Sequence, residues 1–190
     1  MNNSIVFSLP NLLTYGRILA VPAMAACFYF PGTTSNWVAL AIFVTAALTD
    51  FLDGYLARAW KQQSKLGRML DPIADKLLVS VSLLVLTHAG IIGQWSLIAA
   101  IIILCREILV SGLREFLAEL QVSVPVTKLA KWKTTVQLVA IGFLIVGPAG
   151  DAMFPYTTHI GIALLWLAAI LTLYTGYDYF RVGMKHLIDG

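Results

Sequence analysis

The sequence predicts an all-α fold: a polytopic membrane protein with six transmembrane helices, in a single domain over residues 1–190. Composition is the first reason, because 59% of the residues are hydrophobic and 12% are charged, whereas soluble domains have about 45–50% and about 25%. The second reason is that long apolar stretches recur along the whole chain and do not alternate as the strands of a membrane barrel do. These observations exclude an ordinary soluble domain and favour helices, which pair every backbone amide within one segment.

Six apolar segments approach the length of about 20 residues that crosses a hydrocarbon core about 30 Å thick. They cover residues 8–31, 36–58, 68–89, 94–116, 131–149 and 157–181. The first segment lacks a basic leader and a small-residue cleavage site, so we interpret it as a first span and not as a cleaved signal peptide. Cys27 and Cys105 lie inside apolar segments, where we expect buried, unpaired thiols.

The basic residues predict the orientation in the membrane. The connections near 32–35, 89–94 and 148–157 contain no Lys or Arg, and all thirteen basic residues fall on or near the other side. By the positive-inside rule, both termini and the connections 59–67 and 117–130 are cytoplasmic. A short chain without a transit peptide favours a bacterial inner membrane. We expect lipid and no nucleic acid as surroundings.

Four aspartates interrupt this apolar chain within residues 49–76. They are Asp50, Asp53, Asp71 and Asp75. An aspartate at the middle of a membrane helix costs about 2.5–3.5 kcal/mol on insertion scales, so the four must face the protein interior or water. Helical spacing places Asp50 and Asp53 on one face of one helix, and Asp71 and Asp75 on one face of the next. In an antiparallel hairpin, Asp50 comes level with Asp75, and Asp53 level with Asp71.

Four converging carboxylates need cations in order to stay ionised together. Hard oxygen ligands in a partly open site suit Mg²⁺ or Mn²⁺, and two ions about 3.5–4 Å apart could clamp a phosphoryl group. A cation or proton pathway of a transporter would also explain the acids. It explains neither Arg58 beside them nor their confinement to one mouth of the membrane. A purely structural ion-pair cluster is the other alternative, but the local bases are too few for it.

Small residues share the acidic faces. Gly54, Ala57 and Gly67 leave room for a flat ligand to approach the backbone, although small residues also permit close helix packing. Arg58 lies at the mouth, where it could pair with a phosphate.

The identity and spacing of these residues resemble the signature of the CDP-alcohol phosphotransferases at every one of its positions. It reads Asp50-x2-Asp53-Gly54-x2-Ala57-Arg58-x8-Gly67-x3-Asp71-x3-Asp75, eight fixed residues over 26 positions. The resemblance implies the six-helix membrane fold of that family, commonly a homodimer, with its site open to the cytoplasm. It also implies a reaction that depends on Mg²⁺ or Mn²⁺, in which a CMP-linked group is transferred to an alcohol.

The resemblance further implies roles for these residues. The four aspartates hold the metals, and Asp75 is also the base that takes the proton of the acceptor hydroxyl. The residues implied to line the CDP site are Asp53, Gly54, Ala57, Arg58 and Gly67.

Three looser motifs are similar to those of phosphatidylglycerophosphate synthases. They are residues 10–17, residues 106–108 with 112–115, and residues 131–137. This resemblance implies CDP-diacylglycerol and sn-glycerol 3-phosphate as substrates and CMP as a product. Cardiolipin synthases of the same fold share the first and last motifs in part, so a different acceptor remains the alternative.

Polar residues outside the signature are further candidates. Asn11 and Thr14, one turn apart at the start of the first helix, could hydrogen-bond the nucleotide or cap the helix. The acceptor carries its own phosphate, for which the chain offers four cations: Arg106, Arg114, Lys131 and Lys133. Arginine favours forked contacts with phosphate. The alternative for these cations is an ion pair with Glu107 or Glu115.

Overall fold

The computed structural model describes residues 9–30, 32–59, 65–119 and 128–188, with side chains except at 9–10, 51–59, 65, 68, 128 and 182–188. Within these ranges every regular element is a helix. The six helices are α2 (Leu9–Cys27), α3 (Thr33–Ala59), α4 (Lys65–His88), α5 (Ser96–Glu119), α6 (Lys128–Asp151) and α7 (Thr157–Ile188). The all-α prediction is therefore confirmed for the described part of the chain.

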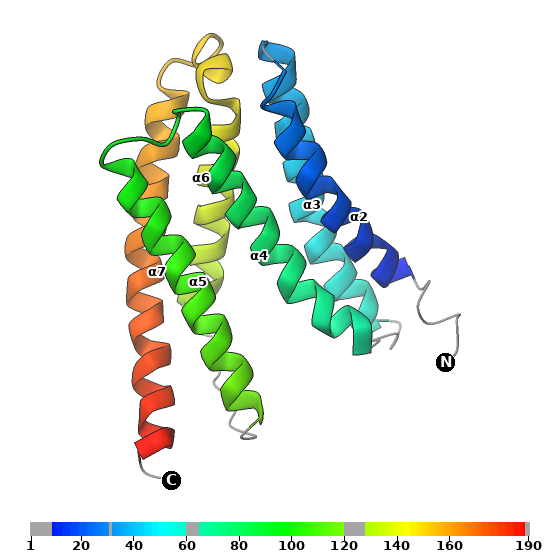
Figure 1. Ribbon diagram of the computed structural model, residues 1–190, viewed down its shortest axis with the longest axis vertical. Coiled ribbons are helices and arrows are strands. Elements are labelled where there is room, and N and C mark those ends of the chain that lie inside the picture. Colours follow the sequence, from blue (N-terminus) through cyan, green and yellow to red (C-terminus); the bar gives the residue numbers. More distant parts are fainter. Residues whose placement is uncertain (1–8, 31, 60–64, 120–127, 189–190) are drawn as a thin grey trace.

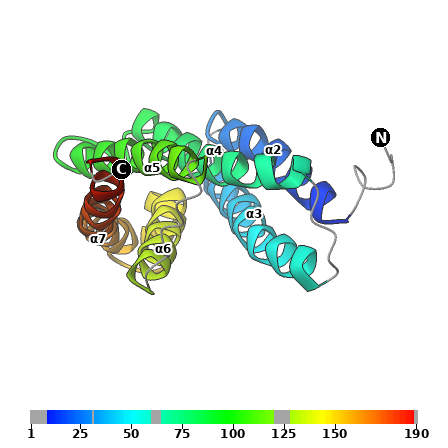
Figure 2. The same ribbon diagram turned by 90° about the horizontal axis from the view of Figure 1, so that it is seen from below.

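Consecutive helices run in opposite directions, so the first and last described helices have their free ends at the same end of the bundle (Figure 1). Seen along the bundle, α2, α4 and α5 form one layer, and α3, α6 and α7 form the other (Figure 2). The closest packing joins α6 to α7 and α2 to α3, whereas α4 and α5 touch only sparsely. The sparse contact between α4 and α5 leaves room for the pocket described below.

Three of the described helical segments are long and apolar enough to cross a membrane. They are Ser96–Glu119, Leu129–Asp151 and Thr157–Arg181. The first half of α4 is much more polar, because five of its first twelve residues are charged. The number of six spans therefore stays a prediction, whereas the three apolar helices agree with a membrane-embedded helical protein.

The helix ends differ from the predicted spans by a few residues. The last helix shows the largest difference, since it continues to Ile188 although the apolar segment ends at residue 181. Apolarity marks where a span leaves the lipid, whereas a helix continues until a breaker ends it. A local backbone feature also marks the end of the fifth predicted segment, because Gly147 has φ 44° and ψ −125° and kinks α6 just before Pro148. An added Cβ there would lie 3.3 Å from Ile91 Cδ1, so the turn favours glycine.

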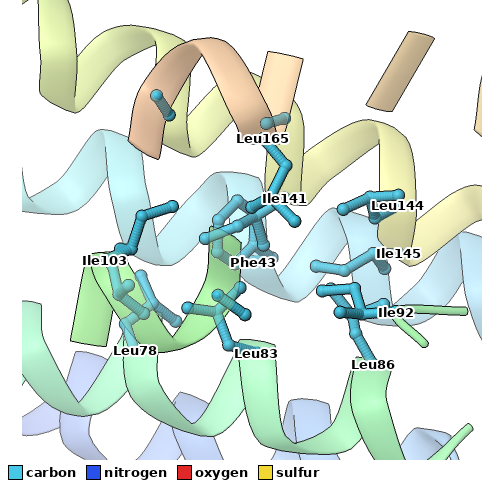
Figure 3. Close-up of a cluster of buried hydrophobic side chains, with 14 of the residues drawn as sticks. Phe43, Leu78, Leu83, Leu86, Ile92, Ile103, Ile141, Leu144, Ile145 and Leu165 are labelled. Atoms are coloured by element: carbon cyan, nitrogen blue, oxygen red, sulfur yellow. The ribbon is translucent and has the colours of Figure 1, made fainter. Parts of the chain in front are cut away.

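A buried apolar cluster joins all six described helices. Phe43 of α3 lies among leucines and isoleucines of α4, α5, α6 and α7 (Figure 3). Its fully buried members include Leu78, Leu83, Ile103 and Ile141, each at most 1% exposed. Burial of a leucine or isoleucine side chain contributes about 1.5–3 kcal/mol in water. In a bilayer, close packing supplies the attraction, because lipid is as apolar as the core.

The outer surface of the bundle is apolar as well. Leu19, Ile108 and Ile170 are 60–70% exposed, as expected for side chains that face lipid. A cavity of about 760 Å³ between α3 and α6 is lined almost wholly by apolar side chains. The prediction of buried thiols was wrong: Cys105 is exposed and Cys27 is half-buried, both unpaired. The error has a simple cause, since an apolar segment in lipid buries only one of its faces.

Candidate active site

Helix α2 presents a buried polar face to the aspartates. Asn11, Thr14 and Arg17 are at most 3% exposed and follow one another at three-residue intervals, which places them on one side of the helix. Thr14 Oγ1 donates a hydrogen bond of 2.7 Å to Asp71 Oδ1. Arg17 Nη1 forms an ion pair with Asp50 Oδ1. Thr14 therefore makes a contact between helices, which helix capping does not explain.

The aspartates of the signature lie on two neighbouring helices, as predicted. Asp50 belongs to α3 and is 44% exposed at its side chain, whereas Asp71 and Asp75 are one turn apart on α4. Asp75 is within electrostatic range of Asp50 and Arg17. The hairpin of α3 and α4 thus brings the acids at the ends of the signature toward one another.

The donor set suits a hard divalent cation but is incomplete in the described part. Carboxylate oxygens are the ligands that Mg²⁺ prefers. Among the described side chains, no group of three or more His, Cys, Asp and Glu residues converges closely enough to hold a metal ion. Asp53 lies outside those side chains, so a shared metal site of four aspartates stays a prediction. In this structure, the Arg17 guanidinium and the Thr14 hydroxyl satisfy Asp50 and Asp71.

Several predicted nucleotide-site residues also fall outside the described side chains. The backbone of α3 carries Gly54, Ala57 and Arg58 near its end, but their side-chain surroundings are not described. Gly67 is described and is buried near the start of α4. The roles of these residues in binding CDP stay predictions.

A pocket of about 330 Å³ lies between α4 and α5. Its lining residues lie toward the start of α4 and the end of α5, and these two helix ends point to the same end of the bundle (Figure 1). Its volume is at the small end of the range of about 300–1,000 Å³ that is typical of ligand pockets. The charged residues that line it are Asp75, Lys76, Arg106, Glu107, Arg114 and Glu115. The structure thus joins the predicted base to two of the four predicted phosphate ligands in one cavity.

Arg106 is held against α7. Its Nη2 donates a hydrogen bond of 3.1 Å to Thr175 Oγ1, and its guanidinium carbon lies 5.9 Å from the centre of the Tyr179 ring. Gly176 makes this approach possible, since an added Cβ would lie 3.1 Å from Arg106 Cγ. The Nε atom of Arg106 is buried and has no hydrogen-bond partner among the described residues. This arginine is therefore pre-positioned and retains donor capacity.

Glu107 joins α5 to α6 through a buried ion pair. Its Oε1 atom accepts a hydrogen bond from Lys133 Nζ, with the lysine side chain 4% exposed and the glutamate 19%. The same Oε1 atom lies 3.5 Å from Arg106 Nη1. Lys133 therefore adopts the predicted alternative, an ion pair with Glu107, and it does not line the pocket. Lys131 is exposed on α6 and is also outside the pocket lining.

Lys76 and Glu115 bridge the rim of the pocket. Lys76 Nζ donates to Ser111 Oγ and lies 3.9 Å from Glu115 Oε1. Ser111 Oγ in turn donates a hydrogen bond of 3.3 Å to Glu115 Oε1. Lys76 offsets the charge of Glu115, and Glu107 is shared by Lys133 and Arg106. Arg114 is the lining cation that has no acidic partner among the described side chains, and it shares the pocket with Asp75.

Sequence reasoning missed Arg17 and Lys76 as site residues, and it named Glu107 only as an ion-pair partner for the basic residues. Arg17 entered only as the last residue of the motif 10–17, although it continues the three-residue spacing of Asn11 and Thr14. For Lys76 the chain offers no comparable signal, because its partners Ser111 and Glu115 belong to α5, whose packing against α4 the sequence does not fix.

Comparison with known proteins identifies the family of this chain. Residues 7–174 match the family model described as CDP-alcohol phosphatidyltransferase. A Cereibacter sphaeroides protein named CDP-diacylglycerol–glycerol-3-phosphate 3-phosphatidyltransferase is 44% identical, over 96% of this chain and 98% of its own length. A protein of the same name from Rickettsia bellii is 44% identical, over 94% of this chain and 97% of its own length. Another, from Shigella flexneri serotype 5b, is 39% identical, over 96% of this chain and 98% of its own length. The chain belongs to the CDP-alcohol phosphatidyltransferase family.

Proposed function

We propose that this protein transfers a phosphatidyl group from CDP-diacylglycerol to sn-glycerol 3-phosphate, giving phosphatidylglycerophosphate and CMP in phospholipid biosynthesis. The observation that carries the proposal is the pocket between α4 and α5, which places Asp75 in one cavity with Arg106 and Arg114. The relatives that are named for this reaction match nearly the whole of this chain over nearly their whole own lengths, which supports the choice of acceptor.

The two arginines of the pocket suit the phosphate of the acceptor. Arg106 and Arg114 are close enough to interact electrostatically, and like charges brought together are unfavourable unless an anion lies between them. Arg114 forms no ion pair or hydrogen bond with the other described residues. A phosphate dianion would relieve the repulsion and use the forked donors of both side chains. We assign the acceptor phosphate to these two residues ahead of Lys131 and Lys133, which lie outside the pocket lining.

Asp75 is proposed to act as the general base. Its carboxylate would take the proton of the 1-hydroxyl of sn-glycerol 3-phosphate. The hydroxyl oxygen then bonds to the phosphorus that carries diacylglycerol, the phosphorus–oxygen bond to CMP breaks, and CMP leaves. The pocket holds the phosphate at one end and the hydroxyl at the other, which converts an encounter in solution into a positioned reaction.

A divalent metal site of Asp50, Asp53, Asp71 and Asp75 is part of the proposal. Two ions, Mg²⁺ or Mn²⁺, would neutralise the pyrophosphate and the charge that develops on it in the transition state. The all-carboxylate donor set supports this choice of metal. Arg17 and Thr14 would orient Asp50 and Asp71 through the contacts that they make here.

The nucleotide is proposed to bind beside the metals, with the acyl chains of CDP-diacylglycerol in lipid. The proposed ligands and lining residues are Asn11, Thr14, Asp53, Gly54, Ala57, Arg58 and Gly67. The burial of Asn11 and Thr14 on the face of α2 that meets Asp71 supports their place at this site.

The cellular setting is proposed from the charge pattern and the family resemblance. The basic residues favour an orientation with both termini and the site cytoplasmic, and the proposed membrane is a bacterial inner membrane. The family resemblance favours a homodimer, and the whole chain is proposed to act as one domain.

Release of CMP by the purified protein tests the proposal. With Mg²⁺, CDP-diacylglycerol and sn-glycerol 3-phosphate, the protein should release CMP and form phosphatidylglycerophosphate, and Asp75→Asn should abolish turnover. Phosphatidylglycerol, serine and inositol phosphate serve as alternative acceptors. Release of CMP with phosphatidylglycerol but not with sn-glycerol 3-phosphate would move the assignment to a cardiolipin synthase. Full turnover by Asp75→Asn would refute the assignment of Asp75 as the general base.

A further inference from the structure

Glu107 is an acid in a pocket that we assign to an anion, and its two oxygens are used unequally. Both recorded contacts, with Lys133 Nζ and with Arg106 Nη1, are made by Oε1. Oε2 has no hydrogen-bond partner among the described residues. Glu107 lines the pocket together with Asp75, so its second oxygen is available to a ligand there.

The glutamate is also held in place from behind. Lys133 is only 4% exposed at its side chain and fixes Oε1 from α6. Arg106, the neighbouring residue on α5, is itself anchored to Thr175 of α7. A carboxylate that is held in this way costs little further ordering when it binds a hydroxyl group.

The proposed acceptor has three polar groups in a row along its carbon chain. Its 1-hydroxyl is assigned to Asp75, and its phosphate to Arg106 and Arg114. The secondary hydroxyl lies between these ends, and Glu107 lies in the same lining, adjacent in sequence to Arg106 and within electrostatic range of Asp75. An ionised carboxylate accepts hydrogen bonds and does not donate them, which matches a hydroxyl donor.

We propose that Oε2 of Glu107 accepts a hydrogen bond from the secondary hydroxyl of the acceptor and thereby determines acceptor specificity. This inference rests on the proposed function. Glu107 then supplies a third point of attachment beside the base and the arginines. Three fixed points distinguish mirror images, so the same contact selects sn-glycerol 3-phosphate over its enantiomer, sn-glycerol 1-phosphate.

The test compares acceptors that differ only at this hydroxyl. Two are sn-glycerol 3-phosphate and 3-hydroxypropyl phosphate, which lacks the secondary hydroxyl, and the third is the enantiomer. A hydrogen bond to a charged acceptor predicts a wild-type preference of about tenfold to hundredfold in kcat/KM for sn-glycerol 3-phosphate. Equal rates for all three acceptors in the wild type would overturn the inference.

Matched variants separate specificity from structure. The double variant Glu107→Met/Lys133→Met removes the carboxylate oxygen that would accept the hydrogen bond from the substrate. It also removes the buried Lys133 ammonium, which would otherwise lose its ion-pair partner. The control Lys133→Met keeps Glu107, which retains Arg106 as a partner. The double variant should lower the preference for sn-glycerol 3-phosphate toward one, whereas the control should keep it even if its overall rate falls.

Each result decides the question. A merely structural role for Glu107 would lower kcat/KM for all three acceptors by the same factor and keep the preference, which would overturn the inference. If the double variant is inactive, Glu107→Gln carries the comparison, and a preference equal to the wild type would also overturn it. A wild-type protein that releases no CMP with sn-glycerol 3-phosphate would instead refute the proposed function itself.

Discussion

The buried ion pair between Glu107 and Lys133 predicts an asymmetric loss of stability. Loss of one partner of a buried pair costs about 3–5 kcal/mol, because the other charge is left in a poorly solvated place. Glu107→Met leaves the Lys133 ammonium 4% exposed, with no other ion pair among the described residues. Lys133→Met leaves a carboxylate that is 19% exposed and still lies 3.5 Å from Arg106 Nη1. We therefore expect the free energy of unfolding to fall by about 3–5 kcal/mol in Glu107→Met and by about 1–2 kcal/mol in Lys133→Met.

Thermal unfolding in detergent measures this difference. For a chain of about 150–250 residues, 1 kcal/mol shifts Tm by about 2–4 °C. The shift should be about 6–20 °C for Glu107→Met and about 2–8 °C for Lys133→Met. Glu107→Met/Lys133→Met should unfold at a higher temperature than Glu107→Met alone, because the double variant leaves no buried Lys133 ammonium without a partner. An equal or larger shift for Lys133→Met would refute the reasoning.

Three further predictions follow from packing, hydrogen bonding and metal binding. Gly161→Ala should destabilise the protein by about 1–3 kcal/mol, because the added Cβ would lie 2.8 Å from Leu144 Cδ2. The control Gly112→Ala should not destabilise it, because no atom lies within 4 Å of a Cβ added there. Equal Tm values for the two variants would contradict this prediction. Thr14→Val should cost about 1–3 kcal/mol, since it removes the hydrogen bond of 2.7 Å to the charged Asp71, and an unchanged Tm would show that the bond does not contribute. Chelation by EDTA should stop the release of CMP, and added Mg²⁺ should restore it; continued release in EDTA would exclude the metals.

The apolar segments were enough to predict the helices, because in a membrane the length of a span and the pairing of its backbone are fixed by the lipid. The ends of the helices were less predictable. Helix α7 continues past the apolar segment to Ile188, and α6, which ends at Asp151, is kinked at Gly147, where φ is positive. Helix length depends on such local backbone features as well as on hydropathy.

The candidate site was predictable where its residues share one helix. Spacing along the chain placed Asp71 and Asp75 on one face, and the same spacing would have included Arg17 with Thr14. Contacts between helices were not predictable in this way. The choice of Lys133 between a phosphate and Glu107 depends on how α5 packs on α6, and no residue pattern within either helix decides it.

The central claim is that the pocket between α4 and α5 binds the phosphate of the acceptor. The most direct test is the apparent KM of Arg114→Gln for each of its two substrates. Arg114 lines the pocket and is close enough to Arg106 to interact with it electrostatically, so the variant should raise the KM for sn-glycerol 3-phosphate by about tenfold or more and leave the KM for CDP-diacylglycerol nearly unchanged. An unchanged KM for sn-glycerol 3-phosphate, or an equal rise for both substrates, would contradict the claim.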